Sequence, residues 1–533
     1  MTEQAAEILR QTNFTPLDWV IVAAYLGISV LIGIWVNRYV GNMAAYVGAG
    51  RSLGTCLGIA TMTGTELGLI TVMYSAQKGF NGGFAAFHIA VIAGVATFLV
   101  GLTGFIVADL RRHRVLTIPE FYELRFGRGV RVLGGVMLAF AGILNMGLFL
   151  KVGSMFIVGI TGLSAEGWAL PTVMTVLLLL VLTYTVLGGM VSVVLTDYIQ
   201  FVVLSIGLVA TTLLAISHLG WSNIFTTIHS EMGAGGYDPL VSEGEFGWEY
   251  VAWMAITAGL VGCAVWPTAV ARALAMESVE SVKRQYRWSS VSFTIRFLIP
   301  YFWGICAFVF IKTNAAELET VFFTADGKTV QEMELYAMPV FLGRILPMGM
   351  IGLISAAMVA AFMSTHDSYL LCWSSVITQD VVAPLRRKPM STRARIRLTR
   401  VLIVLIGAYV LFWGLFYEAE QDVWDYMAIT GAVYFTGAIA LLVGGLYWKK
   451  ASTAGAYAGL IAGSSAVLGL DPLRIPLGKA IGEMQSIKDF ELTGAQVGLF
   501  SVALTCVVFI AFSLLIPDRQ PRSPQVQDEE TPE

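Results

Sequence analysis

Long apolar runs separated by short polar segments make up most of this chain. Thirteen of these runs are long enough to cross a membrane as helices, since a spanning helix needs roughly 20 mostly apolar residues. They centre on residues 18–37, 53–76, 83–108, 132–160, 168–187, 196–217, 249–270, 290–311, 345–378, 398–416, 425–447, 452–469 and 496–516. Helices are expected because every backbone group inside a bilayer must be satisfied within its own segment, and the alternation of β-barrel strands is absent. The pattern predicts an all-α integral membrane protein with about 13 transmembrane helices.

Composition supports this class. Hydrophobic residues make up 56% and charged residues 13% of the chain, whereas a soluble domain carries about 25% charged residues. The net charge of -3 gives no indication of nucleic-acid binding. The 5 cysteines form no CxxC pair, so neither a zinc site nor a disulfide framework is predicted.

The basic residues predict the orientation. The clusters 111–114, 386–388 and 393–397 fall on one side of the predicted spans, and basic residues concentrate on the cytoplasmic side. This puts residues 1–15 outside and the tail 517–533 in the cytoplasm of a bacterial-type inner (plasma) membrane. The tail is rich in Pro, Gln, Asp and Glu and is predicted to be disordered.

The second span contains the first polar stretch, Thr61 to Gly68, in which glycines and threonines surround Glu66. Irregular backbone at membrane depth is tolerated where it lines a cavity, and an interrupted helix frees carbonyls that can bind a cation. The alternative is a set of small residues at a contact between helices.

The ninth span contains the second stretch, from Ser364 to Ser368, with Asp367 inside it. Ser364 and Ser368 share a helix face, and hydroxyl and carboxylate oxygens suit a hard cation such as sodium. Serines that bond back to their own helix would explain the hydroxyls but not Asp367. A third stretch, Gly188–Gly189 followed by Thr196 and Asp197, is by itself typical of a helix N-cap.

Together these stretches resemble the sodium:solute symporter family. The matching motifs are Gly50-Arg51-Ser52-Leu53-Gly54, Leu187-Gly188-Gly189-Met190 with Thr196-Asp197 and Gln200, Pro267 with Arg272-Ala273-Leu274-Ala275, and Ala360-Ala361 with Met363-Ser364-Thr365 and Asp367-Ser368. The resemblance implies a LeuT-like core of two inverted five-helix repeats within a transmembrane domain over 16–516. The repeats would be 53–217 and 249–447, followed by C-terminal helices over 452–516, with broken helices at 53–76 and 249–270.

The resemblance also implies the ion ligands. The family's usual sodium site corresponds here to Gly64, Leu67, Ala361, Ser364 and Thr365. A second sodium, found in some members, would involve Asp197, Ser364, Asp367 and Ser368. Asp367 stands where some members have serine, so it could strengthen a cation site, be protonated or be paired.

The solute is expected at mid-membrane between the broken helices. The candidate contacts are Thr63, Thr65, Glu66, Gly68, Lys151, Trp253, Trp266 and Tyr434. Lys151 lies well inside an apolar run and needs a cavity, an interface or an acidic partner. Two hypotheses stay open: Lys151 binds a solute carboxylate, or it pairs with Glu66. Arg296 is expected to be structural or to reach an interface.

These features predict a sodium-coupled symporter for a small polar solute, such as a carboxylate or an amino-acid-like compound. A sugar or polyol symporter and a proton-coupled member of the same fold are the alternatives. No channel filter motif is present, and no HExxH, GxSxG or phosphate-binding loop suggests an enzyme. The partners expected are a small solute and membrane lipid, without nucleic acid or an obligatory protein partner.

Overall fold

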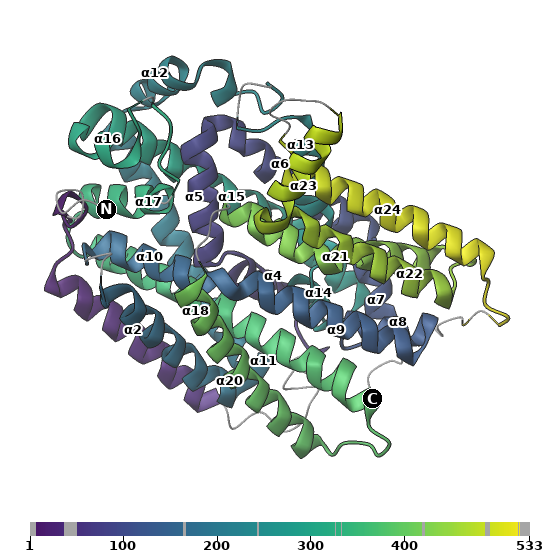
Figure 1. The fold of residues 1–533 in the computed structure, drawn as a ribbon. Coiled ribbons are helices and arrows are strands. Elements are labelled where there is room, and N and C mark those ends of the chain that lie inside the picture. The colour runs from purple at the N-terminus through teal and green to yellow at the C-terminus, as the bar shows by residue number, and fades with distance from the viewer. Residues whose placement is uncertain are drawn as a thin grey trace.

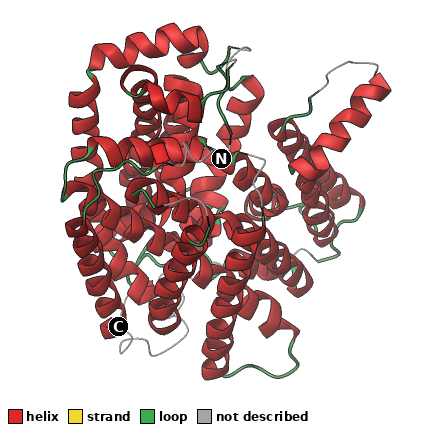
Figure 2. Ribbon diagram, turned by 60° about the vertical axis from the view of Figure 1, so that its left-hand side comes forward, coloured by secondary structure: helices red, strands yellow, loops and turns green. Residues whose placement is uncertain are grey.

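The computed structural model describes residues 7–36, 51–163, 167–241, 245–325, 327–331, 333–417, 422–485, 491–520 and 522. Helices joined by short loops make up nearly all of this part of the chain (Figure 2). Within it, nine helical segments are long and apolar enough to cross a membrane, or ten if one bent pair counts as a span. The chain is therefore a multi-pass membrane protein. The predicted domain ends, residues 1–6 and most of 517–533, lie outside the described residues.

The helices follow the predicted order along the chain (Figure 1). The first half contains α2 (Pro16–Val36), α4 (Thr55–Glu66), α5 (Leu69–Gly82), η3 (Gly83–Ala86), α6 (Phe87–Thr103), α7 (Val107–Arg112), α8 (Ile118–Phe126), α9 (Arg128–Asn145), η4 (Met146–Leu148), α10 (Phe149–Thr161), α11 (Ala169–Leu219), α12 (Trp221–Met232) and η5 (Gly233–Gly236). The second half contains α13 (Trp248–Met254), η6 (Ala255–Val265), α14 (Pro267–Leu274), α15 (Val279–Asn314), α16 (Ala316–Phe322), α17 (Glu334–Ile345), α18 (Met350–Val376), η7 (Ile377–Val382), α19 (Ala383–Leu385), α20 (Thr392–Phe416), α21 (Val423–Tyr447), α22 (Thr453–Gly463), η8 (Ser464–Gly469), α23 (Asp471–Gln485) and α24 (Gly494–Leu515). Each predicted span coincides with one or more of these elements.

The structure differs from the prediction at the boundary between the fifth and sixth predicted spans, where no break is assigned. Helix α11 runs through 51 residues without an assigned break, so the expected N-cap at Thr196 or Asp197 is wrong. A straight helix of this length would measure about 76 Å, more than twice the roughly 30 Å of hydrocarbon in a bilayer. Both predicted spans therefore lie within α11. The side chains of residues 187–197 lie outside the described set.

Two helices are interrupted near their middle. The first break separates α4 from α5 at Leu67 and Gly68. The second separates η6, which is a π-helix, from α14 at Trp266. Pro267 follows this break at the first position of α14, where its missing N–H costs nothing. Both predicted broken helices are thus present.

The two broken helices lie in the middle of the bundle. Helix α15 packs along α5 and α6, and α18 packs against α11, α2 and α4. Helices α22 and α24 pack side by side along one flank, and α12 and α16 lie at the end away from α7 and α8 (Figure 1). The first break therefore faces α15 and α18, and polar side chains of both helices contact it.

Candidate functional site

The break between α4 and α5 leaves backbone carbonyls without helical donors. Leu67 has φ −95° and ψ 66°, and Gly68 has ψ 163°, so both leave the helical region. The last carbonyls of any α-helix lack intrahelical N–H partners and need others. Inside a bilayer those partners must come from neighbouring side chains.

Two hydroxyls of α18 meet these carbonyls. Ser364 Oγ donates to the carbonyl oxygen of Gly64 at 3.2 Å, and Thr365 Oγ1 donates to that of Thr65 at 3.4 Å. Ser364 is fully buried and Thr365 is 3% exposed. The arrangement brings carbonyl and hydroxyl oxygens together in a low-dielectric site, which is the chemistry a desolvated sodium ion requires. Leu67 lies directly after these carbonyls, and Ala361 lies one turn before Thr365 in α18.

Gly68 allows this close approach. A Cβ atom at Gly68 would lie 2.0 Å from Thr365 Oγ1, far inside contact distance. Any larger residue would have to push α18 or the break apart. The glycine is therefore needed for the packing of Thr365 as well as for the break.

One of the residues predicted for a second ion contacts a guanidinium group. Ser368 Oγ donates to Asp367 Oδ1 at 3.2 Å and accepts from Arg272 Nη2 at 2.7 Å. Asp367 is fully buried, and Arg272 of α14 is 2% exposed. The side chain of Asp197 lies outside the described residues. A fixed positive charge thus already contacts one of the proposed ligands.

The partner of Glu66 is Arg296 of α15. Arg296 Nη1 lies 2.8 Å from Glu66 Oε2 and 3.3 Å from the carbonyl oxygen of Glu66. Thr268 donates to Glu66 Oε1 at 2.8 Å. The guanidinium carbon lies 3.9 Å from the ring centroid of Phe293 and 4.5 Å from that of Phe297. These contacts satisfy a charge pair at membrane depth, where an unpaired charge would be costly.

This ion pair lines a small cavity of about 100 Å³ between the two breaks. Thr65 and Thr365 line one side, so the carbonyl–hydroxyl cluster and the cavity share residues. The remaining wall is mainly aromatic and apolar, with Asn145 as a further polar group. It includes Tyr74, Trp266, Tyr369, Trp424 and Phe435. An apolar enclosure with a few convergent polar groups is typical of small-molecule sites.

The predicted solute residues are only partly brought together. Thr65, Glu66 and Trp266 line the cavity. The others lie beside it or elsewhere: Thr63 donates to Ile59 of its own helix, Gly68 contacts Thr365, Trp253 packs against Gly498, and Tyr434 bonds to Tyr122. Lys151 donates to the carbonyl of Tyr417 at 2.8 Å and is not among the cavity's lining residues. The hypothesis that Lys151 pairs with Glu66 is therefore replaced by the Arg296 pair. The sequence signal for Arg296 is a charge inside an apolar run, which is the same signal that singled out Lys151.

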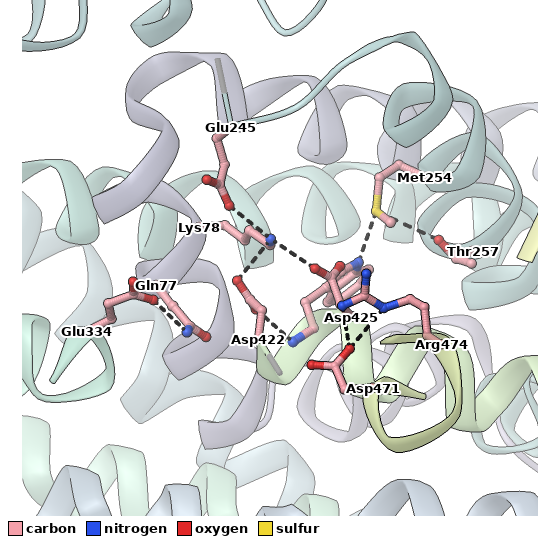
Figure 3. Close-up of polar contacts among 11 residues, drawn as sticks. Gln77, Lys78, Glu245, Met254, Thr257, Glu334, Asp422, Asp425, Asp471 and Arg474 are labelled. Atoms are coloured by element: carbon pink, nitrogen blue, oxygen red, sulfur yellow. Dashed lines mark hydrogen bonds and ion pairs between the residues drawn. The ribbon is translucent and has the colours of Figure 1, made fainter. Parts of the chain in front are cut away.

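A charged cluster lies one helical turn further along α5 from this cavity. Lys78 is 2% exposed, and its amine lies 2.9 Å from Asp422 and 3.3 Å from both Asp425 and Glu245 (Figure 3). Tyr74, one turn before Lys78 in α5, lines the cavity, and Lys78 itself lines a polar vestibule of about 520 Å³. The cluster therefore ties α5 to the start of α21 between cavity and vestibule.

Two broken helices around a buried cavity, within a multi-pass helical bundle, define the class of secondary transporters with discontinuous helices. The family model for "Sodium:solute symporter family" matches residues 46–463. The chain therefore belongs to the sodium:solute symporter family, and its function is sodium-coupled import of a solute.

Individual relatives are distant but cover most of the chain. The high-affinity proline transporter PutP of Bacillus subtilis (strain 168) is 26% identical over 82% of this chain and 89% of its own length. The sodium/glucose cotransporter of Vibrio parahaemolyticus is 23% identical over 86% of both chains. A solved Na+-coupled sialic acid symporter, 18% identical, superposes with a TM-score of 0.75 over 96% of this chain and all of that one. This likeness confirms the predicted LeuT-like fold.

We predict that Gly68→Ala weakens sodium-dependent uptake and lowers stability. Its Cβ would overlap Thr365 Oγ1, and overpacking of this kind costs about 1–3 kcal/mol. Gly54→Ala is the matched control, because a Cβ there meets nothing within 4 Å. Uptake in proteoliposomes and melting temperature in detergent check both variants. Wild-type sodium dependence in Gly68→Ala would show that the close approach to Thr365 is unimportant.

Proposed function

We propose that this transporter imports a small carboxylate-bearing solute, such as an amino-acid-like compound, together with one sodium ion. The single observation that carries the solute class is Arg296, whose guanidinium lines the cavity beside Glu66. The relatives' solutes, which include proline, glucose and sialic acid by name, leave the class open.

In this proposal sodium binds where the helix break meets α18. The carbonyls of Gly64, Leu67 and Ala361 and the hydroxyls of Ser364 and Thr365 would be its ligands. The 3.2 Å contact from Ser364 to Gly64 supports this, because the two oxygens are already close enough to share an ion. A sodium ion there would join α4 to α18, and the hydroxyl protons would turn away from the carbonyls.

Coupling would follow from residues that belong to both sites. Thr65 and Thr365 line the solute cavity and also meet through the Thr65 carbonyl. An ion held by this pair would fix the cavity wall and so raise the affinity for solute. By thermodynamic linkage, the solute would raise sodium affinity by the same factor.

Arg296 would bind the solute carboxylate, and Glu66 would bind an amino group where the solute has one. The pair gives the cavity no net formal charge, which favours a zwitterion over a free cation. Arg296 Nε has no hydrogen-bond partner among the described residues. The ion pair with Glu66 therefore leaves this N–H available to a solute carboxylate. The aromatic rings would hold the apolar body of the solute.

One ion per cycle is proposed because the second site already has a cation. Arg272 lies 2.7 Å from Ser368, and its charge opposes sodium binding at Asp367 and Ser368. Asp197 is left without a role in this scheme. The same argument makes proton coupling through Asp367 less favourable than sodium coupling.

The proposed orientation follows the basic residues. The N-terminus would lie outside and the C-terminus in the cytoplasm of a bacterial-type plasma membrane. The vestibule beside Lys78 would then open outward, and the Lys78 cluster would close the outer side.

We predict that Ser364→Ala raises the sodium concentration for half-maximal uptake by roughly tenfold or more. A hydrogen bond or ligand to a charged group is worth about 1.5–3 kcal/mol. Thr365→Ala should act in the same direction. Ser374→Ala is the matched control, because this buried serine of α18 bonds back to Leu371.

Ser368→Ala separates one ion from two in the same uptake assay. With one ion, sodium activation stays hyperbolic and its midpoint is unchanged in Ser368→Ala. Sigmoidal activation that becomes hyperbolic in this variant would instead require the second site. Unchanged sodium dependence in Ser364→Ala and Thr365→Ala, at normal expression, would move the first site elsewhere.

We predict that the double variant Glu66→Gln/Arg296→Gln folds and still binds sodium but no longer takes up carboxylate solutes. Removing both charges avoids the unpaired carboxylate that Arg296→Gln alone would leave. The measurement is competition of labelled uptake by amino acids, monocarboxylates and glucose in proteoliposomes. Lys151→Met is the comparison, and its uptake should persist.

The reverse pattern would refute the assignment. If Lys151→Met abolishes uptake while the double variant transports normally, the carboxylate contact belongs to Lys151. Competition by glucose and by no carboxylate would support a sugar carrier instead.

A further inference from the structure

Another cavity, of about 460 Å³, lies where α8 and α9 meet α19 and α20, and it shares no lining residue with the solute cavity. Its wall contains five arginines and two glutamates, so positive charge is in excess. The arginines are Arg128, Arg131, Arg386, Arg387 and Arg395. None of these residues contributes to the ion or solute sites described above.

Part of this charge is already used within the protein. Arg131 Nη1 lies 2.6 Å from Glu123, and its guanidinium lies 2.8 Å from the buried Asp380. Arg395 donates to Gln379 Oε1 at 2.9 Å. Glu120 accepts from the backbone N–H of Leu116 at 2.6 Å. These contacts build the inner wall and hold it in place.

The remaining charge is uncompensated. Among the described residues, Arg128, Arg386 and Arg387 form no ion pair with any carboxylate. Gln379 lines the cavity, is 6% exposed, and its Nε2 has no hydrogen-bond partner in the described part of the chain. Arg395 Nε is also a buried donor without a partner there. Arg128, Arg386 and Arg387 are exposed at the rim of the cavity, and the spare buried donors lie in its wall. This arrangement offers a binding site for an anion.

The surroundings indicate where that anion comes from. The helices that carry the arginines continue with exposed apolar side chains: Val136 and Phe140 on α9, and Val401 and Leu405 on α20. Leu385, directly before Arg386, is 63% exposed. Such surfaces lie against lipid in a membrane protein, so the cavity opens at the level of the headgroups. Basic pockets between transmembrane helices bind the head groups of anionic lipids.

We propose that this cavity binds the phosphate headgroup of an anionic phospholipid, whose acyl chains lie along α9 and α20. Arg386 and Arg387 would make the outermost contacts, and Arg128 and Gln379 the inner ones. Lipid bound here would join α9 of the first predicted repeat to α19 and α20 of the second. The proposal stands independently of the solute and of the sodium ligands.

The test measures the melting temperature of the detergent-solubilised protein during titration with short-chain phosphatidylglycerol. Phosphatidylcholine and inorganic phosphate are titrated in parallel, to separate an anionic lipid from lipid in general and from a free anion. We expect stabilisation by phosphatidylglycerol alone, weakened by high salt. In Arg386→Gln/Arg387→Gln the half-saturating concentration should rise roughly 30-fold, the loss expected for two charges near an anionic lipid.

Two further variants make the result specific. Lys388→Gln/Arg393→Gln removes the same charge from two basic residues that are exposed, as Arg386 and Arg387 are, but do not line the cavity. This variant should behave as wild type. Arg386→Lys/Arg387→Lys keeps the charge and should retain most of the binding. Equal stabilisation by phosphatidylcholine or by inorganic phosphate would overturn the proposal. An equal loss in Lys388→Gln/Arg393→Gln would do so as well.

Discussion

The structure depends on one constraint, which is that backbone carbonyls freed inside a bilayer must find new partners. The chain leaves helical geometry at Leu67 and Gly68, at membrane depth, where water is excluded. Ser364, Thr365, Thr71 and Arg296 supply donors to the carbonyls of Gly64, Thr65 and Glu66. Ser364 and Thr365 belong to α18 and Arg296 to α15, whereas Thr71 belongs to α5 directly after the break. The break therefore depends on α18 and α15 being in place. The polar centre and the packing of the bundle are therefore the same feature.

This constraint also explains how an ion and a solute can be linked. The carbonyls satisfied by hydroxyls in this structure are the groups that a cation would take over, and Thr65 belongs to the solute cavity as well. In the proposed mechanism, a change at one site would alter the hydrogen bonds at the other. The Lys78 cluster extends the connection, because Tyr74 and Lys78 lie one turn apart on α5. Rearrangement at the break would be transmitted along α5 to the Lys78 cluster.

The sequence predicted the elements better than the contacts. The spans follow from apolar length, which is a local property. The two broken helices were implied by the family resemblance, with the glycines of the first and Pro267 of the second as local signals. The contact between Ser364 and Gly64 was predicted through family resemblance, since 300 residues separate the two. Composition could not assign the partner of Glu66. Lys151 and Arg296 are both charges in apolar runs, and only the packing of α15 against α5 decides between them. The helix through Gly188 and Gly189 was also missed, because two glycines favour a break but do not require one.

The most direct test is the melting temperature of the purified protein in sodium, potassium and choline chloride at equal ionic strength. An ion that binds only the folded state stabilises it by mass action, increasingly as its concentration exceeds the dissociation constant. A site made by the break and α18 predicts a rise with sodium alone, absent in the Ser364→Ala/Thr365→Ala variant. Identical melting temperatures in the three salts, or a sodium effect that survives in that variant, would contradict a sodium site at the helix break.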